Sequence, residues 1–165
     1  MRSIVVEPLT ADAYAPYGNV IAATERFRPA NQGTAKKSEH LAELLETRGA
    51  RANVSVFRCT PRVLPHAVTL LEKHPASTQV FVPMNAVRYL AIVALGGDAP
   101  DLSTLRAFEA SPTQGITYHP GIWHHPMVAL ERETDFFCLV FEDGTAGDCV
   151  EHAVSEPVSV LPARP

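Results

Sequence analysis

Fourteen prolines distributed along 165 residues constrain this chain more than any other feature of its sequence. A proline inside a helix removes a hydrogen bond and clashes with the preceding turn, so long helices are excluded. Short β-favouring runs remain, such as residues 88–95, which are apolar nearly throughout and are expected to be buried on both faces. Roughly eight to eleven such runs predict an all-β sandwich or barrel, of the double-stranded jelly-roll type.

At most two short helices are expected beside these strands. Residues 40–47 have helical spacing and precede Gly49, a residue suited to follow a helix end. Residues 101–108 begin with Asp101, which can cap a helix N-terminus, and Thr10 can cap a single helical turn. Strands are expected at residues 3–6, 18–23, 53–60, 63–72, 78–82, 88–95, 116–119, 123–130 and 135–141. The chain is expected to form one domain over residues 1–165, with residues 153–165 as a C-terminal tail.

The composition narrows the classes of function. The net charge is -4, and no basic run is longer than Lys36-Lys37, which argues against a nucleic-acid-binding protein. No stretch is long and apolar enough to be expected to cross a membrane, and no signal-peptide pattern is expected at the N-terminus. The three cysteines lack a C-x-x-C spacing, which indicates a reducing compartment, so that a cytoplasmic location is expected.

Residues 115–126 concentrate residue types that carry chemistry. They contain three of the seven histidines and the only tryptophan. The Pro120-Gly121 pair favours a tight turn, because proline presets φ and glycine accepts a positive φ. A turn of this kind just before His124 would hold the imidazole in one place, as a metal ligand or general base requires. The alternative is an ordinary turn with a structural histidine. A second group of reactive residues elsewhere in the chain is needed to favour a functional site over this alternative.

Glu72, His74 and Gln79 supply that second group. Residues two apart on a strand project from the same face, so Glu72 and His74 can point together into a barrel interior. After a turn at residues 75–77, Gln79 is expected opposite them on the neighbouring strand. A buried cluster of this kind is costly unless each group is paired, so a satisfied polar network is the alternative to a site.

The spacing Glu72-x-His74-x4-Gln79, followed by Pro120-Gly121-x-x-His124, resembles the two cupin motifs. In those motifs a His-x-His pair precedes a glutamate, and Pro-x-Gly-x-x-His follows later in the chain. Glu72 and His74 stand in place of the histidine pair, Gln79 in place of the glutamate, and His124 in place of the last histidine. More specifically, the chain resembles the ureidoglycolate lyase family in the stretches LEKHPASTQVFVPM, VALGGDAPDLSTLRAF, GITYHPGIWHHP and TDFFCLVFEDG. The resemblance is weakest over residues 26–51 and after residue 152.

This resemblance implies a homodimeric cupin-fold enzyme of allantoin and purine catabolism. Such enzymes split ureidoglycolate into glyoxylate and urea, a carbon–nitrogen lyase reaction that proceeds by acid–base elimination. The proton carriers would be Glu72, His74 and His124, with Gln79 orienting urea. The same four residues are the candidate ligands of a divalent metal (Ni, Mn, Fe or Zn). Because the amide of Gln79 is a weaker donor than a carboxylate, the metal is expected to be weak or optional. No organic cofactor is expected.

Four further residues are candidates for binding the substrate. Arg58 can bind a carboxylate through two parallel hydrogen bonds, although a surface ion pair would explain it equally well. Asn31 can reach over the mouth of the site, either in its own chain or from a dimer partner. Tyr118 and Trp123 flank the turn, so that one can line the pocket while the other packs in the core. Two other functions stay open: a cupin-type module that binds a small organic acid without turnover, and an amidohydrolase that releases ammonia from ureidoglycolate.

Overall fold

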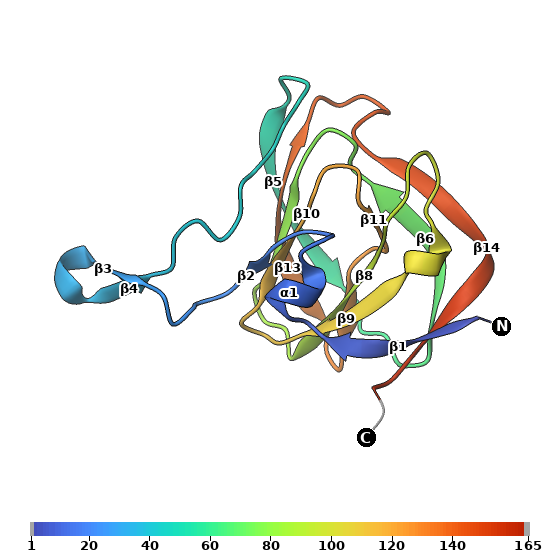
Figure 1. Cartoon of the computed structure of the whole chain (residues 1–165), viewed down its shortest axis with the longest axis horizontal. Coiled ribbons are helices and arrows are strands. Elements are labelled where there is room, and N and C mark those ends of the chain that lie inside the picture. The colour runs from blue at the N-terminus through green and yellow to red at the C-terminus, as the bar shows by residue number, and fades with distance from the viewer. Residues whose placement is uncertain (1, 164–165) are drawn as a thin grey trace.

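The computed structural model describes residues 2–163, and its strands form two main sheets (Figure 1). The seven-stranded sheet has the order β11-β6-β14-β1-β9-β8-β12, and the five-stranded sheet has the order β2-β10-β7-β13-β5. A further pairing between β11 and β8 curls the larger sheet into a closed barrel. The prediction of an all-β barrel of the cupin type is therefore confirmed.

The elements have the following bounds. The larger sheet contains β1 (Ser3–Pro8), β6 (His66–Lys73), β8 (Arg88–Ala94), β9 (Arg106–Ala110), β11 (Trp123–His124), β12 (Val128–Leu130) and β14 (Val150–Leu161). The smaller sheet contains β2 (Val20–Ile21), β5 (Arg51–Cys59), β7 (Gln79–Pro83), β10 (Gly115–Tyr118) and β13 (Thr134–Glu142). The remaining elements are α1 (Ala11–Tyr14), β3 (Arg28–Ala30), β4 (Ala35–Lys37) and the 3-10 turns η1 (Asn31–Gly33) and η2 (Leu102–Thr104).

Strand β8 separates two hydrophobic cores, as its uninterrupted apolar sequence predicts. Tyr89 and Ala91 pack between the two sheets, against β7, β10 and β13. Leu90 and Ile92 point the other way, into a core that the seven-stranded sheet encloses on its own. Because both faces of β8 are buried, the strand holds the two cores at a fixed distance from one another. The candidate site lies in the core between the two sheets.

Two helix predictions were wrong, in whole or in part. Residues 40–47 contain no helix, because the carbonyl oxygen of Leu45 accepts from the backbone N–H of Thr78, its N–H donates to Thr78 Oγ1, and Glu46 forms a β-bridge to Ser77. Asp101 does accept a hydrogen bond from the backbone N–H of Ser103, but the turn it caps ends at Thr104. The residues that follow form β9 between β1 and β8 instead. In both places strand pairing outweighs a marginal helical preference. The helical turn capped by Thr10 is confirmed.

The expected C-terminal tail is also wrong for most of its length. Strand β14 extends to Leu161 and pairs with β6 on one side and β1 on the other. Val154, Val158 and Val160 are buried in the enclosed core. Residues 153–165 contain three prolines, but Pro157 lies at an irregularity of the pairing, between Ala153 and Val158. Residues 164–165 of the predicted tail lie outside the described residues.

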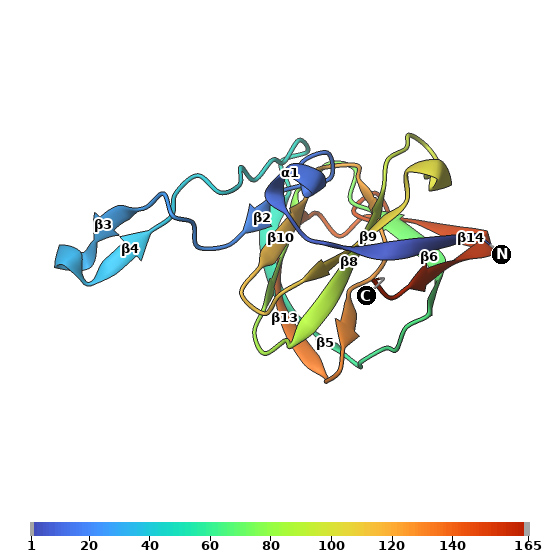
Figure 2. The same ribbon diagram turned by 60° about the horizontal axis from the view of Figure 1, so that its bottom comes forward.

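One segment stands away from the barrel. Residues 24–39 form a hairpin of β3, η1 and β4, which we call the arm, and it projects from the barrel in two views (Figures 1 and 2). The strand expected at residues 18–23 is reduced to β2 at the base of this arm. Among residues 2–163, no helix is long and apolar enough to span a bilayer.

Gly18 provides a test of how α1 and β10 are packed together. A Cβ atom at this position would lie 1.8 Å from the carbonyl oxygen of Thr117, which is backbone and cannot move aside. We expect Gly18→Ala to lower the free energy of unfolding by about 1–3 kcal/mol or more, the usual cost of overpacking. Gly97→Ala is the matched control, since nothing lies within 4 Å of its added Cβ. Urea unfolding of both variants measures the difference, and equal stabilities would contradict this packing.

Candidate functional site

Glu72 and His124 face each other across two paired strands. Glu72 lies on β6 and His124 on β11, and the two residues are direct partners in the antiparallel pairing. The turn that precedes β11 is tied to the end of β6, because Gly121, with a φ of 79°, donates its N–H to the carbonyl oxygen of His74 at 2.9 Å. The predicted Pro-Gly turn therefore holds His124 beside Glu72 and His74.

These three side chains form one cluster between the sheets. One ligand atom from each lies within 4.8 Å of the others. The rings of His74 and His124 are stacked, with centroids 5.7 Å apart and an interplanar angle of 17°. Both histidines are buried, whereas 21% of the Glu72 side chain is exposed. The sequence prediction that Glu72, His74 and His124 converge is thus matched by the geometry.

Two backbone carbonyl groups determine which nitrogen of each imidazole carries hydrogen. Nδ1 of His74 lies 2.8 Å from the carbonyl oxygen of Asp148, and Nδ1 of His124 lies 3.0 Å from that of Ile122. A carbonyl oxygen only accepts hydrogen bonds, so each Nδ1 is the donor and each neutral ring has its lone pair on Nε2. Both Nε2 atoms are buried and have no hydrogen-bond partner.

The charges in the cluster follow from burial and from this tautomer. Burial lowers the pKa of His74, and the neighbouring His124 lowers it further, so the ring is neutral at neutral pH. Burial raises the pKa of the Glu72 carboxyl, whereas its contact with His124 and the nearby imidazoles lower it. The lowering effects are larger together, so the pKa of Glu72 lies below its usual value. Glu72 Oε1 and His124 Nε2 are 3.4 Å apart. A carboxylate facing a lone pair at this distance is repulsive unless a proton or another cation lies between them.

The donor set fits a divalent metal ion. Two neutral imidazole nitrogens and one carboxylate oxygen are the set that non-haem iron sites use, and nickel, manganese and zinc accept the same ligands. The hydrogen bonds from Nδ1 to backbone carbonyls are the usual outer partners of metal-binding histidines, because they fix the ring and its tautomer.

Gln79 lies on the opposite side of this space from the position expected for it. It was expected on the strand beside Glu72 and His74, but β7 belongs to the other sheet. Its Oε1 is buried without a partner, and its Nε2 donates a weak hydrogen bond to Cys138 Sγ at 3.7 Å. Gln79 pairs with Tyr118, whose ring stacks on that of His124 at 3.9 Å. The unsatisfied amide oxygen is thus one strand away from the stack.

Tyr118 and Trp123 have different surroundings. Tyr118 is buried against His124 with the two rings nearly parallel, at 7°, so it limits the movement of the imidazole. Trp123 points to the other face of β11, into the enclosed core, and donates its Nε1–H to the carbonyl oxygen of Gly97. Of the two, only Tyr118 contacts the cluster.

Arg58 and Asn31 are not brought to the cluster of their own chain. Arg58 is 68% exposed and forms two hydrogen bonds with the carboxylate of Asp135. It shares the outer face of β5 with Val54 and Val56, so the surface ion pair is the correct interpretation. Asn31 lies in η1, between β3 and β4, and the hairpin of these two strands stands well away from the barrel in Figures 1 and 2.

Asp148 and Arg48 are positioning residues that the sequence did not reveal. The carboxylate of Asp148 accepts hydrogen bonds from the backbone N–H groups of Asp143 and Gly144 and pairs with Arg48. These contacts hold the loop whose carbonyl oxygen accepts from His74. The acidic turn is visible in the sequence, but its contact with a residue 100 positions away is not.

Comparison with known proteins gives consistent results. The family model described as "Ureidoglycolate lyase" matches residues 1–161. A protein named ureidoglycolate lyase from Pseudomonas syringae pv. tomato is 37% identical over 159 residues, which cover 94% of this chain and 92% of the relative. One of the same name from Salmonella paratyphi B is 42% identical over 145 residues, covering 87% and 89%. Among solved structures, a 3,4-ketoisomerase from Helicobacter canadensis covers 81% of this chain and 89% of its own, at 13% identity and a TM-score of 0.48. The sequence comparisons therefore decide the family.

The tautomers can be measured directly. In chelator-treated protein with 15N-labelled histidine, above the usual histidine pKa of about 6.5, long-range 1H–15N spectra should show protonated Nδ1 and unprotonated Nε2 for His74, because its Nδ1 donates to the carbonyl oxygen of Asp148. The exposed His40 is the internal control and should show a mixture of tautomers. A protonated Nε2 on His74 would contradict the geometry described above.

Proposed function

The chain belongs to the ureidoglycolate lyase family, and from that premise we propose that it splits ureidoglycolate into glyoxylate and urea. The observation that carries this proposal is the group of Glu72, His74 and His124, with two buried Nε2 lone pairs facing a carboxylate. Unsatisfied buried polar atoms cost about 1–3 kcal/mol each. Such a cost is typical of a site that gains its partners only when a ligand binds.

The reaction requires two proton movements. Ureidoglycolate carries a hydroxyl, a carboxylate and a ureido nitrogen on one carbon. A base removes the hydroxyl proton, C=O forms as the C–N bond breaks, and an acid protonates the departing urea nitrogen. We assign the base to His74 Nε2, because this atom is neutral and unpartnered. The acid is the proton shared by Glu72 and His124, whose 3.4 Å contact requires one when no other cation is present.

Gln79 and Tyr118 would complete this arrangement from the other sheet. The free Oε1 of Gln79 can accept a hydrogen bond from an N–H group of urea, and the contact of its Nε2 with Cys138 orients the amide. Tyr118 keeps the ring of His124 parallel to its own, so that Nε2 stays directed at the cluster.

A divalent metal ion, when bound, would be held by the two Nε2 atoms and the Glu72 carboxylate, with Gln79 Oε1 as a candidate fourth ligand. It would polarise the hydroxyl and carboxylate oxygens of the substrate and lower the pKa of the hydroxyl. Nickel, manganese, iron and zinc remain the candidates, and the neutral amide of Gln79 favours weak binding.

Two accompanying assignments belong to the same proposal. We infer a cytoplasmic location, which the three free cysteines Cys59, Cys138 and Cys149 support. We also infer a homodimer.

Activity measurements on variants test the assignment. With ureidoglycolate as substrate and an enzyme-free blank, His124→Ala and Glu72→Gln should each lower the rate of urea release by about 10²- to 10⁴-fold, the usual contribution of an acid or base. Arg58→Gln is the control and should stay within about twofold, because Arg58 is paired with Asp135 on the surface.

The products distinguish the competing functions. Urea with glyoxylate supports the lyase, whereas ammonia in place of urea identifies an amidohydrolase. Binding of the substrate without either product identifies a binding module. Full activity of His124→Ala would remove the cluster from the mechanism.

A further inference from the structure

We propose that His66 and His125 form a metal site of their own, which takes a zinc, copper or nickel ion between their Nε2 atoms. The two rings lie outside the group of Glu72, His74 and His124. A site there would bind a metal ion whether or not the chain splits ureidoglycolate.

Both imidazoles stand on backbone that strand pairing holds in place. His66 begins β6 and pairs with Val160 of β14. His125 directly follows β11, and its N–H donates to the carbonyl oxygen of Ile92 in β8 at 2.9 Å. All of these strands belong to the seven-stranded sheet, so the sheet sets the separation of the two rings.

The spacing of the two ring nitrogens suits a shared metal ion better than a hydrogen bond. His66 Nε2 and His125 Nε2 lie 3.4 Å apart. Hydrogen bonds donated by nitrogen are usually shorter, at about 2.7–3.2 Å. Two zinc–nitrogen bonds of about 2.0–2.1 Å at a tetrahedral angle place their nitrogens about 3.3–3.4 Å apart. The observed spacing is therefore that of two ligands on one tetrahedral ion.

The orientation of the rings agrees with this geometry. Their centroids are 5.0 Å apart and their planes meet at 81°. The centroid separation exceeds the nitrogen separation by only 1.6 Å (5.0 − 3.4), which is less than the two ring radii that an end-to-end hydrogen bond would add. The rings therefore meet at an angle, as two imidazoles on one ion do.

The tautomer of His125 leaves its Nε2 free to bind. Its Nδ1 lies 2.7 Å from the carbonyl oxygen of Pro126, so Nδ1 carries the hydrogen and the lone pair of the neutral ring is on Nε2. A hydrogen bond of this kind is the usual outer partner of a metal-binding histidine. Among residues 2–163, His66 Nδ1 has no such partner, so this ring can adopt either tautomer.

A cavity of about 420 Å³ beside the two rings has room for the remaining ligands. Arg62, Thr69 and Met127 line it together with both imidazoles. Two imidazoles fill two of the four positions of a tetrahedral ion, and water can fill the others. Zinc, copper and nickel accept imidazole ligands, whereas magnesium and calcium require oxygen ligands. The donor types therefore select the first group of ions.

Zinc titration of the intact chain tests the site directly. In chelator-treated protein with 15N-labelled histidine, zinc should shift the Nε2 resonances of His66 and His125 together and saturably, and magnesium should leave both unchanged. The exposed His40 is the internal control and should not follow them. Shifts at His74 and His124 report on the cluster, so the two sites are observed separately. A tenfold excess of zinc that leaves His66 and His125 unchanged would overturn the proposal.

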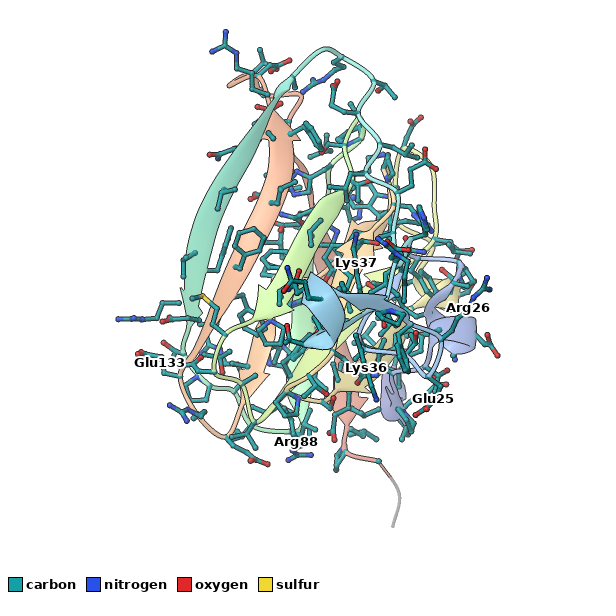
Figure 3. The ribbon with its side chains drawn as sticks, turned by 90° about the vertical axis from the view of Figure 1, so that its left-hand side faces the viewer. Glu25, Arg26, Lys36, Lys37, Arg88 and Glu133 are labelled. Carbon is teal, nitrogen blue, oxygen red and sulfur yellow. The ribbon has the colours of Figure 1, made fainter. Side chains whose placement is uncertain are left out.

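The charge of Arg62 distinguishes a metal ion from an anion in this cavity. Arg62 repels a dication, whereas it would attract a carboxylate or phosphate bound by protonated imidazoles. At low ionic strength, Arg62→Gln should therefore tighten zinc binding, followed at His125, by about two- to tenfold. Arg88→Gln is the matched control and should change it less than twofold. Arg88, labelled at the lower end of the barrel in Figure 3, lies outside this cavity and is paired with Glu109 and Glu131. Weaker zinc binding in Arg62→Gln would overturn the site.

Metal counting after equilibrium dialysis gives a second, independent test. His66→Leu should hold one zinc ion fewer per chain than the intact protein, whatever number the cluster holds, and His40→Leu should hold the same number. A retained unfolding transition shows that His66→Leu is folded. If that variant does not fold, the titration of the intact chain decides. Equal zinc contents in folded His66→Leu and the intact protein would contradict the proposal.

Discussion

The central constraint in this molecule is the placement of two imidazole lone pairs against a carboxylate in a buried space. Backbone carbonyl groups of Ile122 and Asp148 accept the Nδ1–H groups of His124 and His74, so the lone pair of each neutral ring is on Nε2, and His124 Nε2 lies 3.4 Å from Glu72 Oε1. Much of the fold serves this arrangement. The Pro-Gly turn is tied to β6, Tyr118 stacks on His124, and Arg48 and Asp148 organise the loop that supplies one of the carbonyl groups.

The Nε2 atoms of His74 and His124 have no hydrogen-bond partner. This explains why either a proton or a metal ion can occupy the space between His124 and Glu72. Either one removes the repulsion between the carboxylate and the lone pair of His124. With a proton the cluster is an acid–base pair beside a neutral base, and with a metal ion it is a three-ligand site. Under the proposed function, Gln79 in place of the usual glutamate of cupins is expected to favour the first of these states, because an amide contributes no charge.

The sequence predicted the parts of the site that depend on local spacing. Residues two apart on a strand project from the same face, so their spacing places Glu72 and His74 together. The Pro-Gly turn fixes the position of His124, so the sequence predicts that the three side chains form one group. The sequence could not predict that Gln79 lies on the opposite sheet. A turn at residues 75–77 allows the next strand either to pair beside Glu72 and His74 or to enter the other sheet. The same limit explains the wrong helix at residues 40–47 and the wrong tail. Leu45 bonds to Thr78 and β14 pairs with β1 only in the folded chain, and neither partner is close in sequence. Arg58 had two interpretations of equal weight, and only its pairing with Asp135 distinguished them.

The most direct test of this account is to locate where the product binds. Glyoxylate can be titrated into chelator-treated protein with 15N-labelled histidine, while the Nε2 resonances of all seven histidines are followed. The account predicts saturable shifts at His74 and His124 and none at the exposed His40. Saturable binding that leaves His74 and His124 unchanged would contradict the claim that this cluster is the reactive centre.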